Sequence, residues 1–556
     1  MSSSPSRLRQ LCERFLQPNV IIRTVLYLTA MVYLRTIPFD YVFDDGTLIT
    51  IHPWMESWKY LPKFFTHSFW GFLNVPPAID FYRPLVMVVF ATIYHLLGPA
   101  PGWFHLVAAS THVLATYLVY RLVCETTGDK SLGAIAAGIF GLHPTKVETA
   151  AWISGLSDSL SMVFFLAAMI GYFRWRRQPK RKPSLLLMSA SFLLLALFSK
   201  EAAIFAPVLI GIYEFAAASG SFRSRFRAAM TSAWPYAAVT LFAIVIRILL
   251  VRNPTGHVLN KVPIGSTLLT APTAILWYLG KQLWPGSLSI YYPMMIVDHL
   301  SFGRFVLPLL LLLGVVGTVV IAIRKTPVGI FFASWFVLML APVILYHVTL
   351  QEHDRYFYFA SVATSIGLAY VMQGLRHYGA VLQASVVFAL FAAMAVLTFS
   401  YVWYWDNDVR LFTHATQLCG DSPNAYGYLA FVYINQGQTK KAEAIARTLI
   451  ANSDLRARGW YILGTVRLQE KDYEQAREAM QNGFQLSHGK DLLTIMGLAS
   501  TDLKLGRNEE AAQIYRDALK RFPNSAYLHG NLASALKGMG ETDQAARELE
   551  LQRRLQ

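Results

Sequence analysis

Two adjacent carboxylates, Asp44 and Asp45, follow the first apolar segment of the chain, within Phe43-Asp44-Asp45-Gly46. Neighbouring carboxylates resist joint ionisation, because like charges raise each other's pKa. A carboxylate with a raised pKa is suited to take a proton from a hydroxyl group as a general base. The pair therefore predicts a site of proton transfer at a membrane surface, with Asp44 and Asp45 as its candidate catalytic residues.

Further ionisable side chains lie at the ends of apolar segments, where burying a charge is costly and so points to a function. The cations that could hold an anion are Arg83, Lys200 and Arg355. The other site candidates are His143, Glu148, Asp158 and Glu201. The alternative for each residue alone is an outer-surface loop charge or an interfacial anchor, an interpretation that fits Lys146, Glu352 and Asp354 equally well.

A metal site formed by His143, Glu148 and Asp158 is conceivable, although the spacing of these residues is not diagnostic of any metal. The sequence requires no cofactor, and a divalent cation could be bound but is not indicated.

The elements that must position these residues are apolar helices. The 556 residues are 54% apolar, above the usual share of roughly 45–50% in soluble domains. Segments long enough to span a bilayer are 20–37, 104–123, 131–143, 153–173, 184–199, 202–219, 231–251, 303–323, 327–347, 356–374 and 379–403. Segments 84–98 and 268–284 are predicted to be half-embedded or re-entrant. As full spans they would give thirteen crossings with the same final topology.

Charge fixes the expected topology. Residues 1–405 carry 30 of the 49 basic side chains and only 15 of the 33 acidic ones. The basic side chains gather in short loops at 174–182, 223–227, 324–325 and 376, which predicts that these loops face the cytoplasm. The first apolar segment is predicted to be an uncleaved signal anchor, with a cleaved signal peptide as the alternative. We therefore expect a multi-pass membrane protein with residues 1–19 in the cytoplasm and Asp44 outside, and we expect no nucleic-acid partner.

Residues 424–556 repeat one template four times. Leucine followed by a small residue recurs at Leu429, Leu463, Leu498 and Leu532, and alanine follows twelve residues after each small residue. This spacing is typical of the tetratricopeptide repeat (TPR), whose helix pairs stack into a solenoid. The concave face of such an array normally takes an extended peptide or a partner helix. A scaffold for assembly is the alternative. Residues 404–423 are predicted to form a connecting helix.

The ordered set of short motifs resembles one family. The motifs are Phe43-Asp44-Asp45, Tyr82-Arg83-Pro84-Leu85, Gly141-Leu142-His143-Pro144-Thr-Lys-Val-Glu148, Ser199-Lys200-Glu201 and Arg355-Tyr356-Phe357-Tyr358. Together with about eleven spans and an outer repeat array, they resemble the GT-C glycosyltransferases, and among these the transmembrane-and-TPR (TMTC) O-mannosyltransferases and their bacterial relatives. The resemblance implies an all-α chain, with a polytopic GT-C catalytic domain over 20–403 and an extracytoplasmic TPR solenoid over 424–556.

The resemblance also implies an inverting transfer of a sugar, mannose in the family, from a polyprenyl-phosphate donor to Ser/Thr of a protein. Matching positions assign Asp44 as the base, Asp45 as the second carboxylate, and Arg83, Lys200 and Arg355 as ligands of the donor phosphate. The repeat groove would bind the protein or peptide acceptor. The array is shorter than is usual in the eukaryotic proteins, which favours a bacterial relative in the inner membrane. The alternatives are a GT-C transferase acting on a glycan or lipid, and a non-enzymatic membrane TPR scaffold.

Overall fold

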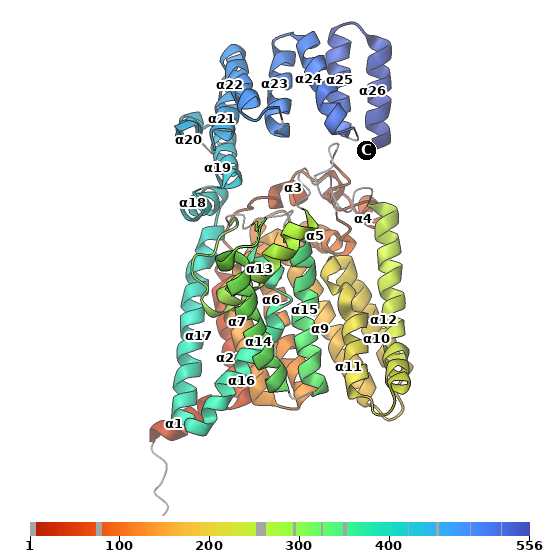
Figure 1. The fold of residues 1–556 in the computed structure, drawn as a ribbon, viewed down its shortest axis with the longest axis vertical. Coiled ribbons are helices and arrows are strands. Elements are labelled where there is room, and N and C mark those ends of the chain that lie inside the picture. The colour runs from red at the N-terminus through yellow and green to blue at the C-terminus, as the bar shows by residue number, and fades with distance from the viewer. Residues whose placement is uncertain are drawn as a thin grey trace, which may run out of the picture. The chain divides into compact units, whose positions relative to one another are not determined.

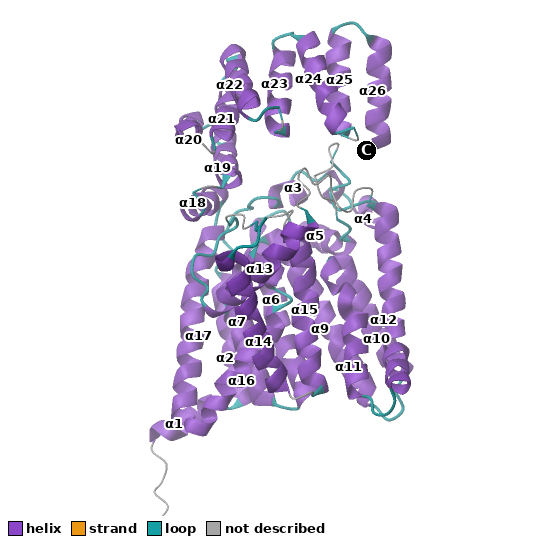
Figure 2. Cartoon of the chain, in the orientation of Figure 1, coloured by secondary structure: helices purple, strands orange, loops and turns teal. Residues whose placement is uncertain are grey.

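The computed structural model describes residues 7–73, 81–251, 263–292, 296–323, 326–347, 353–420, 422–451, 455–489, 491–523 and 525–555. Within these ranges every regular element is a helix (Figure 2), so the expected all-α class is confirmed. Arg324, Lys325, Glu352 and Gln556 lie outside the described residues.

The chain forms two compact units (Figure 1). The membrane unit comprises residues 1–69, 80–290 and 294–407, and the repeat unit comprises 70–79, 291–293 and 408–556.

The long helices of the membrane unit lie side by side as a bundle (Figure 1). They are α2 (Pro18–Leu34), α5 (Pro84–Leu97), α6 (Pro101–Thr127), α7 (Lys130–Leu142), α9 (Leu156–Arg177), α10 (Pro183–Ser199), α11 (Ala206–Ala217), α12 (Phe222–Leu250), α13 (Ile264–Leu283), α14 (Leu307–Ile323), α15 (Pro327–His347), α16 (Ser361–Gly374) and α17 (Ala380–Val402). The short helix α1 (Arg7–Phe15) lies across the foot of the bundle (Figure 1). Each of the eleven predicted segments overlaps one of these helices. Segments 84–98 and 268–284 form α5 and α13.

Among the described residues, five helices are long and apolar enough to cross a membrane, or six if the bent pair α1–α2 is one span. Four shorter apolar helices accompany them, including α5, α7 and α10. These helices indicate an integral membrane protein, and the count of eleven or thirteen spans stays a prediction.

The centre of the membrane unit is α9, which packs against α6 and α10. Its residues Phe165, Leu166 and Met169 are fully buried in a core that includes side chains from α2, α7, α15 and α16. Small residues allow close packing here. A Cβ at Gly138 would lie 2.2 Å from the ring of Phe391 on α17, so an alanine at that position would force the helices apart. Helix α9 is thus a fixed support for the polar segment at its N-terminal end.

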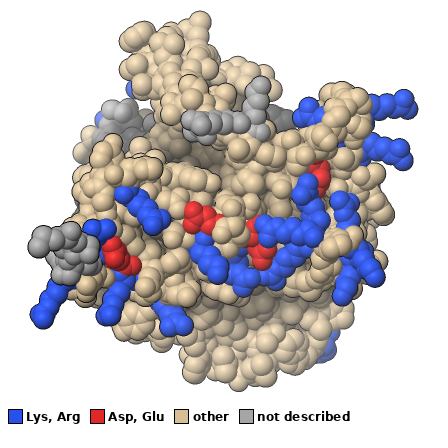
Figure 3. Space-filling view, turned by 90° about the horizontal axis from the view of Figure 1, so that it is seen from below, with Lys and Arg blue, Asp and Glu red and all other residues tan. Residues whose placement is uncertain are grey.

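Basic side chains gather on the face at the foot of Figure 1, which Figure 3 shows with few acidic ones among them. Exposed cations at the end of α9 and in its connection to α10 include Arg174, Arg177, Lys180, Arg181 and Lys182. This distribution is the one expected of a cytoplasmic face. The direction of insertion stays a prediction.

Four short helices connect the long ones around the candidate site residues. They are α3 (Asp45–Ile49), α8 (Val147–Ala151) and the 3₁₀ turns η4 (Ile153–Gly155) and η5 (Glu201–Phe205). A further 3₁₀ turn, η7 (Asp354–Phe357), precedes α16. The 3₁₀ turns η1 (Pro53–Met55) and η2 (Trp58–Tyr60) precede α4 (Leu61–Thr66). Pro62 lies in the first turn of α4, where its missing N–H leaves no hydrogen bond unmade.

The repeat unit contains four helix pairs after α18 (Asp408–Leu418). The pairs are α19 (Pro423–Asn435) with α20 (Thr439–Ala451), α21 (Arg456–Gln469) with α22 (Tyr473–Leu486), α23 (Leu492–Lys504) with α24 (Asn508–Arg521), and α25 (Ala526–Gly538) with α26 (Thr542–Leu555). The small residues of the template, such as Ala430 and Ala442, are buried between the paired helices. The four predicted repeats are therefore confirmed.

The turn inside each pair needs a left-handed residue. Gly437, Gly506 and Gly540 adopt φ of +71°, +76° and +82° there. Lys471 occupies the same place in the second pair with φ of +64°, although a side chain makes that conformation unfavourable.

Candidate active site

The two carboxylates of the acidic pair differ sharply in their surroundings. Asp45 opens α3 and its side chain is completely buried, whereas Asp44 immediately before it is half-buried. One oxygen of Asp45 accepts hydrogen bonds from the backbone N–H of Ser154 at 2.9 Å and from its hydroxyl at 2.5 Å. The other accepts from the N–H of Val42 at 3.2 Å. Asp45 therefore fastens the loop that carries Asp44 to the 3₁₀ turn η4.

Burial raises the pKa of Asp45 to about 7, with the negative charge of Asp44 adding to the effect and the hydrogen bonds from Ser154 and Val42 opposing it. Phe43, the residue before the pair, has a φ of +56°. A bulky side chain in the left-handed region is strained, and such strain is often found at functional sites. Asp44 is the more accessible of the two carboxylates.

Residues 152–158, which form η4 and the first turn of α9, contact both the acidic pair and the cations. The ring of Trp152 lies 5.7 Å from that of Phe43, and the guanidinium of Arg355 lies 4.6 Å above the same indole. Arg83 Nη1 donates to Ser157 Oγ over 3.4 Å. One short segment thus connects the two halves of the candidate site.

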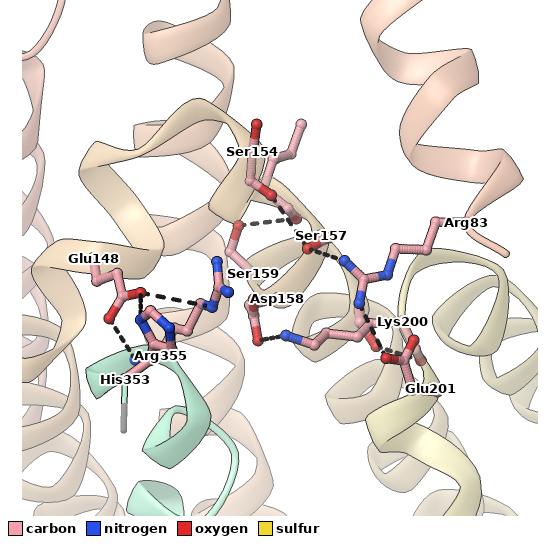
Figure 4. Close-up of polar contacts among 12 residues, drawn as sticks. Arg83, Glu148, Ser154, Ser157, Asp158, Ser159, Lys200, Glu201, His353 and Arg355 are labelled. Carbon is pink, nitrogen blue, oxygen red and sulfur yellow. Dashed lines mark hydrogen bonds and ion pairs between the residues drawn. The ribbon is translucent and has the colours of Figure 1, made fainter. Parts of the chain in front are cut away.

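Charged side chains follow one another with alternating sign around this segment (Figure 4). At one end Arg83, just before α5, pairs with Glu201 of η5 at 3.0 Å. Arg247 of α12 approaches the other oxygen of Glu201 at 3.4 Å. Burial alone would raise the pKa of Glu201, but the charges of Arg83, Arg247 and Lys200 lower it overall. Glu201 is therefore an anion whose charge these cations share.

Lys200 stands at the middle of this line, between α10 and η5. It pairs with Asp158 in the first turn of α9, and the Lys200 and Asp158 side chains are only 11% and 3% exposed. Burial lowers the pKa of Lys200, Asp158 raises it, and the nearby positive charges of Arg83 and Arg355 lower it further. Arg83 and Arg355, the other two cations proposed from the sequence, therefore lie within electrostatic range of Lys200.

Glu148 on α8 holds the last cation, Arg355. One carboxylate oxygen accepts a hydrogen bond from the backbone N–H of Arg355 at 3.1 Å, and the other lies 3.6 Å from its Nε and 3.1 Å from His353 Nδ1. Burial raises the pKa of Glu148, but His353 and Arg355 more than offset that and lower it overall. Glu148 therefore acts on Arg355 as a clamp that fixes both its backbone and its side chain.

The site holds more cations than carboxylates. Arg83, Lys200, Arg247 and Arg355 face three carboxylates, Glu148, Asp158 and Glu201. Among the described residues, the Nε atoms of Arg83 and Arg355 are buried without a hydrogen-bond partner. A phosphate group is the anion best suited to such a set, because arginine donates in a planar fork that matches its oxygens.

His143 belongs to a different surrounding. Its ring nitrogens contact Thr145 Oγ1 at 2.8 Å and the carbonyl oxygen of Gln282 at 2.9 Å, so it is bonded into the bundle and not to the charged line. In the part of the chain that the structure describes, no three of the His, Cys, Asp and Glu side chains could hold a metal ion together. His143, Glu148 and Asp158 therefore do not converge on one metal.

Lys146 and Asp354, for which a surface-loop charge was one interpretation, are both buried. Lys146 donates to Thr145 Oγ1 at 2.8 Å and lies 5.7 Å from the rings of Phe140 and Phe357. Burial lowers the pKa of Lys146 to about 7, while Asp354 raises it. The loop interpretation is thus wrong for these two residues, because the turns that carry them, η3 (Pro144–Lys146) and η7, are packed into the bundle.

Sequence reasoning missed Ser154, Trp152, His353 and Arg247. Ser154 and Trp152 are ordinary residue types whose roles come only from tertiary contacts. Arg247 did carry a signal, because an arginine inside a predicted span normally faces the bundle interior and a charged partner. His353 also carried a signal, because it stands only two residues before the candidate cation Arg355.

Comparisons with known proteins agree with the motifs. Tetratricopeptide repeat models match residues 429–482 and 502–555. The chain is 32% identical over 193 residues to the protein O-mannosyl-transferase Tmtc1 of Drosophila melanogaster. The aligned region covers 34% of this chain and 22% of that protein. It is 29% identical over 152 residues to the mouse protein O-mannosyl-transferase TMTC3, covering 27% of this chain and 16% of that protein. The matches thus span about a fifth of each relative.

Among solved structures, ArnT from Cupriavidus metallidurans bound to undecaprenyl phosphate aligns with 96% of this chain and 88% of its own. The TM-score is 0.37 and the identity 11%. The predicted resemblance to the TMTC O-mannosyltransferases is confirmed by the sequence matches.

Proposed function

We propose that this chain is an inverting GT-C glycosyltransferase that moves a sugar, with mannose the first candidate, from a polyprenyl-phosphate donor to Ser or Thr of a protein. The observation that carries the proposal is the segment 152–158, which contacts the loop of the acidic pair through Trp152 and Ser154 and the cations through Trp152, Ser157 and Asp158. A base and a phosphate site close to each other are what this reaction needs.

In the proposed reaction, the acceptor hydroxyl oxygen attacks the anomeric carbon of the sugar, and the bond from that carbon to the phosphate oxygen breaks. Asp44 takes the hydroxyl proton, while the bond electrons leave with the polyprenyl phosphate, which gains one negative charge. Asp45 is the positioning residue, because its hydrogen bonds to Ser154 hold the loop of Asp44 in place.

The cations stabilise the charge that develops on the leaving phosphate. Fixed donors aimed at a developing charge lower a barrier without reorganisation, and they do so more strongly where water is excluded. Arg83, Lys200 and Arg355 are the residues proposed for this role. Glu148 keeps Arg355 in place, and Glu201 does the same for Arg83.

The charge pattern supports an integral membrane protein with a cytoplasmic N-terminus, and with Asp44 and the repeats on the extracytoplasmic side. A bacterial inner membrane, with the acceptor polypeptide bound in the repeat groove, fits the short array. The lipid donor would then present its headgroup in the outer leaflet, at the level of the acidic pair.

The test is a transfer assay with the purified full chain in phospholipid nanodiscs. Polyprenyl-phosphate mannose and a Ser/Thr-rich peptide are supplied, and intact-glycopeptide mass spectrometry looks for a hexose on the peptide. We expect hexose addition with inverted anomeric configuration, and none from a nucleotide-linked mannose. Transfer to lipid or free glycan, with the peptide untouched, would contradict the proposed acceptor. No transfer from any polyprenyl-phosphate sugar would contradict the enzyme itself.

A further inference from the structure

The repeat unit contains a hollow that no part of the proposed reaction uses. It has a volume of about 580 Å³ and lies among the helices α20, α21 and α22. Ligand pockets commonly measure about 300–1,000 Å³. Seven residues line it: Ile450, Arg456, Trp460, Asn482, Gln485, Leu486 and His488. It is confined to the first two repeats, whereas the peptide groove of a solenoid extends along successive repeats.

One lining residue occupies a regular position of the repeat template. Trp460 stands three residues before Leu463, where tryptophan is the template residue and the other repeats have Tyr426, Ile495 and His529. Ile495 and His529 are buried, whereas Trp460, like Tyr426, is only partly buried. The indole of Trp460 lines the hollow.

His488 departs from the repeat template. It stands twenty-five residues after Leu463, the place that Pro523 takes after Leu498 in the third repeat. His488 adopts a φ of +50° at the end of α22, a conformation that costs energy for a residue with a side chain. Strained backbone at the wall of a hollow is a reason to look for a ligand there.

The chemistry of the lining favours a neutral, hydroxyl-rich ligand. Asn482 and Gln485 offer amide donors and acceptors, and Trp460 offers an apolar ring with one donor. None of the described lining residues is acidic, and none is a lysine. Arg456 already donates its Nε to the carbonyl oxygen of Ile450 at 3.0 Å. A sugar ring has both features that match, since its C–H face stacks on an indole and its hydroxyls bond to planar amides and guanidinium groups.

We propose that this hollow binds a single hexose carried on a polypeptide, so that the repeat unit recognises a chain that already bears a sugar. The choice of mannose as that hexose rests on the proposed function, whereas the binding of a saccharide rests on the lining residues alone. An enzyme that holds its glycosylated product in this way would add further sugars to the same polypeptide before releasing it.

The experiment measures binding and needs no transfer activity. The full chain is labelled with 5-fluorotryptophan, placed in phospholipid nanodiscs and titrated with methyl α-D-mannopyranoside, while ¹⁹F NMR follows the Trp460 resonance assigned with Trp460→Phe. We expect a saturable shift of that resonance. Asn482→Ala and Gln485→Ala should each weaken binding by about 3- to 10-fold, the effect of one lost hydrogen bond. Gln513→Ala, an exposed amide of α24 outside the hollow, should leave binding unchanged.

The absence of a shift at high sugar concentration would overturn the inference. So would an equal shift with an unglycosylated Ser/Thr peptide, which would make the hollow a peptide site, or a shift with inorganic phosphate but not sugar. If the chain binds the mannoside but transfers no sugar, the proposed function fails and this inference stands. If the chain transfers mannose but the mannoside does not shift the Trp460 resonance, this inference fails and the proposed function stands.

Discussion

Ion pairs are buried to different depths in the two units of this protein. In the membrane unit, Arg83 with Glu201 and Glu148 with Arg355 join residues 118 and 207 positions apart, and three of these four side chains are at most 20% exposed. In the repeat unit several ion pairs join residues three or four positions apart, such as Lys520 with Asp517, whose side chains are 74% and 53% exposed. Exposed pairs contribute little to stability. Buried charges are costly unless paired, so the buried pairs of the membrane unit are the ones whose loss should cost most.

The residues of the two units also suit two different tasks. The membrane unit holds charges where water is scarce, which suits bond breaking. The repeat unit is built from small residues and a regular turn, which suits the binding of a chain. The predictions below test that division.

Deletion of residues 424–556 should produce the largest effect. If the repeats present the acceptor, transfer to a long polypeptide should fall by roughly 10²–10⁴-fold, the range of an effective-concentration effect. Transfer to a short peptide at high concentration should fall far less, because every residue proposed for the chemistry precedes residue 404. Initial rates on the two acceptors measure this.

Equal losses on both acceptors would mean that the repeat unit supports the fold of the membrane unit. Unchanged rates on both would make the repeats a scaffold for another protein. Monodisperse elution of the truncated protein, with an unchanged melting temperature, is the control.

Replacing one lysine of each kind of pair with methionine tests the energetic difference. Lys200→Met leaves Asp158 buried without its partner, which should cost about 3–5 kcal/mol. Lys520→Met removes an exposed pair and should cost below about 1 kcal/mol. Hydrogen exchange measured by mass spectrometry, on peptides covering 196–205 and 515–523, reports the local opening free energies. Similar losses at both positions would remove the distinction between the two units.

The pH dependence of stability tests the burial of Asp45. Its folded pKa of about 7 lies above the ordinary value of 3.8, so the folded state binds the proton more tightly than the unfolded state. The stabilisation from that proton is complete below about pH 4 and is lost as the pH rises to about 7. Asp45→Asn carries no such proton.

The melting temperature of Asp45→Asn relative to the native protein should therefore rise between pH 4 and pH 7. The shift corresponds to up to about 3 kcal/mol, given 1.36 kcal/mol per pKa unit. A difference between the two proteins that stays constant with pH would contradict the raised pKa. Asp298→Asn, at a carboxylate that is 74% exposed, provides the comparison.

The smallest effect concerns the turn of the second repeat. Lys471 has a φ of +64°, where the other three repeats have glycine. Lys471→Gly should stabilise the repeat unit by up to about 1 kcal/mol, because glycine adopts this conformation without steric cost. Gly506→Ala should destabilise it by a similar amount. Urea unfolding of the repeat unit, followed by tryptophan fluorescence, gives the free energy of unfolding of each variant. Changes of the same sign in both variants would contradict the prediction.

The sequence was most informative where the structure is local. The four repeats could be predicted because leucine and alanine recur at fixed positions, and each predicted apolar segment overlaps a helix because length and hydropathy are properties of the segment itself. The candidate cations were found for a similar reason, since a charge beside an apolar run stands out.

The pairing of those charges could not be predicted. The sequence around Lys200 does not indicate that Asp158, 42 residues earlier, is its partner. The sequence around Ser154 likewise does not indicate its hydrogen bond to Asp45, 109 residues away. The burial of Lys146 depends on how the turn η3 packs against Phe357. Such contacts are decided by the packing of helices that are distant in sequence.

The division of labour inside the acidic pair is the central claim, and Asp44→Asn tests it most directly. Single-turnover transfer from polyprenyl-phosphate mannose should slow by at least about 100-fold, the low end for a lost general base, while donor affinity stays close to that of the native protein. Asp45→Asn should slow transfer less, because it loosens the loop without removing the base. Near-native transfer by a folded Asp44→Asn protein, or a larger loss from Asp45→Asn, would contradict the assignment.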